Sequence, residues 1–131
     1  MTAAGKALRV LIGMATMLAL SIAAQPAMAQ GAPTKMMNGL LVNDAGMTLY
    51  MYDKDPKGAG KSVCNGKCAK NWPPLMAKVA EKASGEYSII TRDDGSKQWA
   101  YEGKPLYTWV KDEKPGEMTG DNFKSVWHVV R

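Results

Sequence analysis

The two cysteines of this chain, Cys64 and Cys68, have a spacing that allows two kinds of chemistry. Because the first residues predict export, a disulfide is the default for such a pair. Closing this short loop would stabilise the fold by about 2 kcal/mol in the chain-entropy description. Two thiolates at the same spacing also suit Cu(I), and His128 or a methionine would then assist. A disulfide and a periplasmic copper or redox site are both compatible with the sequence.

A second candidate for chemistry is the pair of aspartates Asp55 and Asp112, which occupy equivalent places in a repeated motif. Two carboxylates could serve glycoside hydrolysis if the fold brought them together. The competing interpretation is that each accepts backbone N–H bonds and closes a turn. The sequence contains no G-x-S-x-G, H-E-x-x-H or Gly-rich phosphate loop. We therefore expect no catalytic residue and no cofactor, and an enzyme acting on cell-wall carbohydrate is the weaker alternative.

His128 is the single histidine of the chain and lies in an apolar Trp-His-Val-Val segment. A lone histidine in a strand is more often a half-buried residue with one satisfied ring nitrogen than a metal ligand. The sequence thus predicts a structural role for His128, and a ligand role only in the copper alternative.

The aspartates end two copies of one motif, G-x-x-L-Y-x-aromatic-x-K-D, at residues 46–55 and 103–112. The matching residues are Tyr50, Tyr52 and Asp55 in the first copy and Tyr107, Trp109 and Asp112 in the second. Alternate side chains of a strand share one face, so each copy directs two aromatic rings the same way. We expect these rings to form core or cross-strand ladders. The alternative is a cleft for a cation or a sugar around a pseudo-two-fold axis.

Turn signals recur about every ten residues and separate segments with strand-like alternation. The predicted strands are 38–43, 47–53, 86–92, 97–102, 105–110 and 125–130. Residues 64–72 read as a helical turn that the double proline after Trp72 ends, and 76–83 could form a second short helix. The prediction is a mainly β fold: a small two-repeat antiparallel β meander, compact or barrel-like, with one or two short helices near 64–83.

Each motif copy is followed by a tryptophan, Trp72 or Trp127, at a similar interval. The repeat units therefore span about 38–75 and 95–130. Each unit is too small to bury a core alone, so the two should pack face to face or share one sheet. We expect residues 38–131 to form a single domain.

Residues 1–29 have the pattern of a cleaved signal peptide, with Lys6 and Arg9 before an apolar stretch and Ala27-Met28-Ala29 as the cleavage site. The apolar stretch is shorter than the roughly 20 residues that a membrane span needs. Residues 30–37 read as a flexible lead-in. No cysteine lies near the cleavage site, so we expect a periplasmic or secreted protein that is not lipid-anchored.

Charge and composition exclude several classes of partner. Without Lys6 and Arg9, 15 basic and 12 acidic residues remain, and they are interleaved along the chain. No basic run resembles a nucleic-acid footprint, and the mature chain has no transmembrane segment. We expect a cell-envelope component that does not bind nucleic acid. The sequence does not indicate its partners.

Together with the two motif copies, the segments Cys64-x-Gly66-x-Cys68-Ala69 and Trp72-Pro73-Pro74-Leu75 resemble a known bacterial family. It is the secreted-repeat and lipoprotein family with a duplicated Y-x-[FWY]-x-x-D motif and no established function. The resemblance covers most of residues 38–130 and implies export and a repeated architecture. Many members are lipoproteins, but this sequence lacks the lipobox cysteine. The resemblance implies no catalytic residue.

Overall fold

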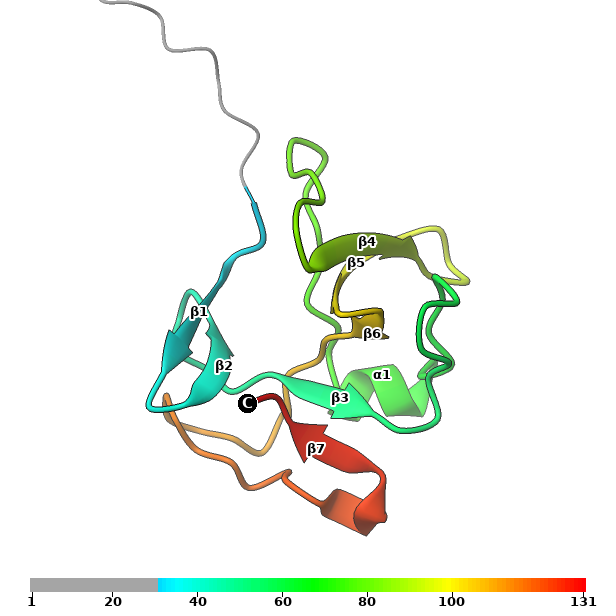
Figure 1. Ribbon diagram of the computed structural model, residues 1–131. Helices are drawn as coiled ribbons and strands as arrows, with labels where there is room; N and C mark the ends of the chain where they lie inside the picture. Colours follow the sequence, from blue (N-terminus) through cyan, green and yellow to red (C-terminus); the bar gives the residue numbers. More distant parts are fainter. Residues whose placement is uncertain (1–30) are drawn as a thin grey trace, which may run out of the picture.

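The computed structural model describes residues 31–131, so the predicted signal peptide lies outside the described residues. The fold is mainly β and antiparallel, as predicted (Figure 1). Its elements in chain order are β1 (Thr34–Met37), β2 (Leu40–Asn43), β3 (Tyr50–Tyr52), α1 (Lys67–Asn71), β4 (Tyr87–Thr91), β5 (Lys97–Tyr101), β6 (Lys104–Pro105), the 3-10 turn η1 (Phe123–Ser125) and β7 (Trp127–Val129).

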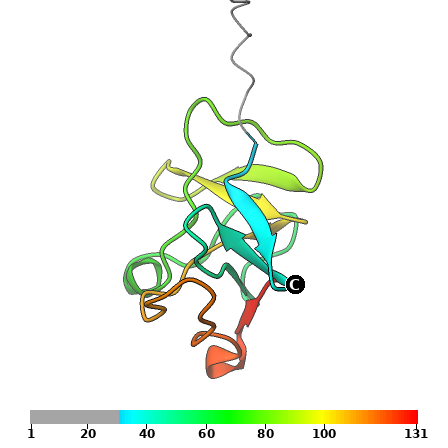
Figure 2. The same ribbon diagram turned by 90° about the vertical axis from the view of Figure 1, so that its left-hand side faces the viewer.

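The strands form three small sheets, β1-β2, β3-β7 and β4-β5-β6. Within residues 31–131, none of these sheets closes into a barrel. Neighbours in sequence pair in the first and last sheets, as in a meander, whereas β3 pairs with the distant β7. The β4-β5 turn is local: Gly95 has φ +87°, and its N–H bonds the Arg92 carbonyl at 2.9 Å. In both views, η1 lies at the opposite end of the molecule from β4 (Figures 1 and 2).

A pseudo-two-fold arrangement relates the two halves, and its centre lies between Tyr50 and Tyr107. Tyr50 and Tyr107 exchange backbone hydrogen bonds, at 2.8 Å from the Tyr50 N–H and 3.0 Å from the Tyr107 N–H. The same relation repeats further out, where Leu49 bonds Leu41 at 3.0 Å and the equivalent Leu106 bonds Trp99 at 3.0 Å. The two copies thus pair directly with each other.

Apolar side chains gather in two clusters. The first, which we call the junction core, contains Tyr50, Cys64, Trp72, Tyr107, Trp109 and Trp127. The second contains Leu41, Leu49, Trp99, Leu106 and Val130. Every residue of both clusters is at most 6% exposed, so the motif aromatics Tyr50, Tyr107 and Trp109 are core residues.

Five of the six predicted strands are present with shorter bounds, as β2, β3, β4, β5 and β7. The sixth, 105–110, is reduced to β6 and two isolated bridges at Tyr107, one to Tyr50 and one to Pro74. The reason lies in the segment opposite it. Tyr107 bridges Pro74, and Thr108 bonds the Pro73 carbonyl at 2.8 Å, but prolines have no N–H to complete a ladder.

Of the one or two short helices predicted near 64–83, the structure has one, α1, and the optional second helix at 76–83 does not form. Met76 instead bridges Gln98, and the Ala77 N–H bonds the Lys97 carbonyl at 2.9 Å. A helix of this length is marginal in water, so pairing with the edge of β5 prevails over local preference.

The flexible lead-in predicted at 30–37 also needs correction, because Thr34–Met37 forms β1. Its register pairs Thr34 with Asn43 and Met37 with Leu40. A tight turn joins the two strands, with Asn38 and Gly39 both at positive φ. Such a turn suits the twist of a hairpin, and Asn-Gly is its preferred sequence.

Candidate functional site

The tyrosines and aspartates of the motif bond across the two copies. The Tyr50 hydroxyl donates to Asp112 Oδ2 at 2.6 Å, and the Tyr107 hydroxyl donates to Asp55 Oδ2. All four residues are buried. Each copy therefore satisfies the aspartate of the other copy, which locks the repeats together reciprocally.

The second oxygen of each carboxylate serves the loop that follows its own motif. Asp55 Oδ1 accepts the backbone N–H of Val63 at 2.7 Å. Asp112 Oδ1 accepts both the backbone N–H and the hydroxyl of Thr119, at 2.9 and 2.6 Å. The aspartates thus connect the motif strand, the following loop and the opposite repeat.

Four aromatic rings form a continuous stack through the junction core, in the order Tyr52, Trp127, Trp72 and Trp109. Successive ring centroids are 4.2, 3.8 and 4.0 Å apart. The central tryptophan pair is nearly parallel, with planes 3° apart, and lies at the pseudo-two-fold centre. Each motif ring stacks on the tryptophan that belongs to the other repeat, so the aromatic contacts are as reciprocal as the hydrogen bonds.

The motif tyrosines complete the stack by meeting its central rings edge-on. Tyr50 contacts Trp72 with centroids 5.2 Å apart, and Tyr107 contacts Trp127 at 5.1 Å. Edge-to-face contacts of this kind add stability beyond the burial of area. The prediction of core ladders therefore describes where the motif aromatics lie.

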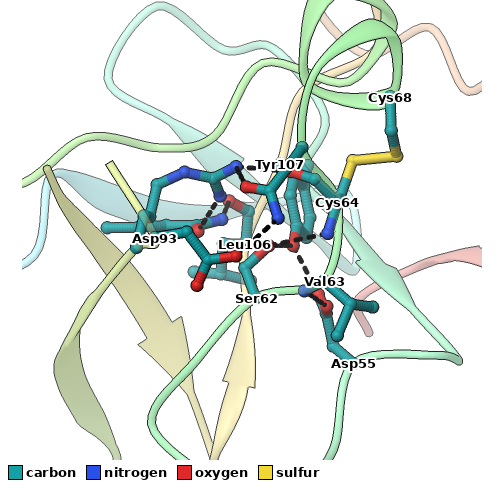
Figure 3. The surroundings of a disulfide bond; sticks show 11 residues. Asp55, Ser62, Val63, Cys64, Cys68, Asp93, Leu106 and Tyr107 are labelled. Carbon is teal, nitrogen blue, oxygen red and sulfur yellow. Dashed lines mark hydrogen bonds between the residues drawn. A yellow bond between two sulfur atoms is a disulfide. The ribbon is translucent and has the colours of Figure 1, made fainter. Parts of the chain in front are cut away.

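Cys64 and Cys68 form a disulfide, with Cα atoms 5.1 Å apart. Cys64 is buried in the junction core, and its N–H bonds Ser62 Oγ at 3.1 Å (Figure 3). Ser62 Oγ in turn lies 2.6 Å from the Tyr107 hydroxyl. The bridge therefore fixes the turn that positions the Tyr107 and Asp55 pair.

Sequence reasoning missed a buried polar layer beside the disulfide. The guanidinium of Arg92 donates to the Cys64 carbonyl and to Gln98 Oε1. Gln98 donates onward to the Leu106 carbonyl at 2.7 Å. Arg92 directly follows β4, and Gln98 lies within β5. The sequence pattern around each therefore did not distinguish it from a solvated polar residue.

Burial changes the acidity of the motif groups. It raises the pKa of Asp55 above its usual 3.8, although bonds from Tyr107 and Val63 oppose the shift. Burial and the hydrogen bond to an aspartate also raise the pKa of Tyr50 and of Tyr107 well above 10. Tyr50 and Tyr107 therefore remain protonated hydrogen-bond donors at any pH at which the protein is folded.

We expect two of the five tyrosines to ionise only when the protein unfolds. The pKa of Tyr50 and of Tyr107 is higher in the folded protein than in the unfolded chain. Their contribution to stability is therefore complete below pH 10 and is lost as the pH rises beyond it. Tyrosinate absorbance during alkaline titration, followed with circular dichroism, should show a late step coincident with loss of structure. Tyr50→Phe should remove about half of that step, and ionisation of all tyrosines in folded protein would contradict the expectation.

His128 lies on the exposed side of β3 and β7, where its Nε2 is 2.8 Å from Asp53 Oδ2. The cysteines are joined to each other in the junction core. Among residues 31–131, no group of three or more His, Cys, Asp or Glu side chains could hold a metal ion. Within the described residues, Cys64, Cys68 and His128 therefore do not form a shared metal site.

A groove of about 380 Å³ runs along one side of the aromatic stack. We call it the junction groove. It is lined by Tyr52, Lys54, Cys68, Asn71, Trp72, Trp109, Phe123, Lys124, Val126 and Trp127. Both repeats contribute to it, together with the disulfide turn and η1. Its volume falls within the usual range of small-molecule sites.

Comparison with protein families agrees with this two-fold construction. One family model, described as a secreted repeat of unknown function, matches residues 37–76 and again residues 88–131. The comparisons with curated proteins and with solved structures found no match. No helix of residues 31–131 is long and apolar enough to cross a membrane. With most of its length matched in two copies, the chain belongs to the family of secreted repeats of unknown function.

Proposed function

We propose that this protein is an exported, non-catalytic binding module. Its repeated motif builds the scaffold, and its binding surface is the junction groove between the copies. The mature protein begins after residue 29 and works in the periplasm or outside the cell without a lipid anchor. The secreted character of the family supports export.

The observation that carries this proposal is the use of the motif's tyrosine hydroxyls and aspartate carboxylates inside the fold. Asp55 and Asp112 accept bonds from tyrosine and from backbone N–H groups. A catalytic carboxylate must instead reach the atoms of a substrate. Both carboxylates are buried behind aromatic rings, which supports a structural role for the pair.

The copper or redox alternative has less support. Both sulfur atoms are in the disulfide, and Cys64 is fully buried. A ring nitrogen of His128 is bonded to Asp53. Copper binding would require reduction of the bridge and a rearrangement of β7, so we favour the binding module.

The mature protein should not turn over glycans or esters. Purified protein is incubated with cell-wall glycan fragments and model esters, beside Asp55→Asn and Asp112→Asn variants. We expect no product above the level of the variants, because neither carboxylate can reach a substrate. Turnover by the wild type that either substitution abolishes would overturn the non-catalytic proposal. Circular dichroism of both variants shows whether a loss reflects unfolding.

A further inference from the structure

The lysines of the repeated motif have no role in the scaffold. Lys54 and Lys111 occupy the same place in the two copies, directly before the buried aspartates. Both are exposed, and within residues 31–131 neither forms an ion pair or a side-chain hydrogen bond. A motif position that the fold leaves unused is a candidate for ligand contact.

These lysines flank the two ends of the aromatic stack. Lys54 lines the junction groove with Lys124, whose ammonium lies 5.6 Å from the centre of the Phe123 ring. Lys111 lines a neighbouring hollow of about 520 Å³ that shares Trp109 and Phe123 with the groove. The two hollows therefore adjoin at these two rings, and the second one places Glu113 beside Lys111.

No carboxylate lines the junction groove. Its two central rings, Trp127 and Trp72, are stacked on both faces, so mainly their edges are available to a ligand. Ring edges carry partial positive charge, whereas ring faces carry partial negative charge. The groove thus attracts oxygen atoms and anions, and it repels a cation.

The tryptophans that line the groove also carry hydrogen-bond donors that the fold leaves unused. Among residues 31–131, Thr48 Oγ1 is the one fully buried side-chain polar atom without a partner. The indole N–H groups of Trp72, Trp109 and Trp127 have no hydrogen-bond partner in that range, and all three side chains line the groove. Indole N–H groups donate only, so the ligand must supply acceptors.

Building on the proposed function, we infer that the junction groove binds an acidic saccharide. Its carboxylates would contact Lys54 and Lys124, and its ring and hydroxyl oxygens would accept the indole N–H bonds. A further acidic unit would reach Lys111 in the neighbouring hollow. A neutral sugar would leave the ammonium groups without partners. The concave shape disfavours a flat anionic membrane.

The test uses the mature protein and three probes, two of which are trisaccharides. They are trigalacturonate, the neutral maltotriose, and tripolyphosphate as an anion without sugar rings. Binding is measured by calorimetry and by intrinsic fluorescence, because three of the four tryptophans line the groove. We expect trigalacturonate to bind most tightly and to weaken with added salt.

The matched variants are Lys54→Gln/Lys124→Gln and the control Lys35→Gln/Lys82→Gln. Both pairs remove two exposed charges, but the control lysines lie outside the groove. The first pair should weaken trigalacturonate binding about tenfold, and the control pair should leave it nearly unchanged.

Four results would overturn the inference. These are equal binding of maltotriose, equal or tighter binding of tripolyphosphate, equal losses in both double variants, and no binding of trigalacturonate by folded protein. Binding of another probe in the groove would leave the proposed function intact. Turnover of a probe would count against the proposed function instead, so the two failures are distinguishable.

Discussion

Replacing Trp72 with alanine should lower the free energy of unfolding by about 4 kcal/mol, the usual cost of deleting a large buried aromatic ring. Trp72 is 3% exposed and stacks on Trp127 and Trp109. It also receives the edge of Tyr50. Its loss would separate the two halves of the stack, because it contacts motif rings of both repeats. Urea unfolding followed by circular dichroism measures the effect.

The pseudo-two-fold arrangement provides the controls for this result. Trp127→Ala should cost a similar amount, because Trp127 holds the equivalent place in the stack. Val79→Ala should cost nearly nothing, because Val79 is fully exposed. If Trp72→Ala does not fold, Trp72→Phe should still show a smaller loss. A cost near that of Val79→Ala would contradict the role of the stack.

Local patterns predicted the parts of this fold that depend on near neighbours. The β4-β5 hairpin follows from alternation around Asp94-Gly95, and α1 ends where the chain meets Pro73. The segment 76–83 could not be assigned in this way. Its conformation depends on pairing with Lys97 and Gln98, which no local preference reveals.

The repeat predicted a two-unit construction but could not specify which aspartate each motif tyrosine bonds. A motif tyrosine could bond the aspartate of its own copy or that of the other one. The observed pairs are separated by 62 and 52 residues in the chain. The choice depends on how the units pack, since identical motifs contain no information about their partner.

The proposed binding surface was harder still to predict. The sequence directed attention to Tyr50, Asp55 and their equivalents, which are buried. The groove depends on ring edges and on Lys54 and Lys124, which come from different repeats. The rings present their edges to the groove because they stack on one another. This arrangement forms only when the two halves pack together, so neither half of the sequence predicts it alone.

Removing one motif carboxylate should be nearly as damaging as removing a ring. Asp112→Ala should lower the free energy of unfolding by about 3 kcal/mol, because it leaves the Tyr50 hydroxyl and the Thr119 N–H without their acceptor. Asp112→Asn should cost less, because an amide oxygen can still accept one of these bonds. Chemical denaturation of both variants at neutral pH gives the comparison.

A double-mutant cycle then tests whether the bonds cross between the copies. Tyr50→Phe combined with Asp112→Ala should show a coupling of about 1 to 2 kcal/mol, because the two residues share one buried bond. Tyr50→Phe combined with Asp55→Ala should be additive within about 0.5 kcal/mol, because these side chains share no partner. The reverse pattern would mean that each copy satisfies its own aspartate. Because each aspartate accepts from the tyrosine of the other copy, cross-coupling would also explain why the motif occurs twice in one chain.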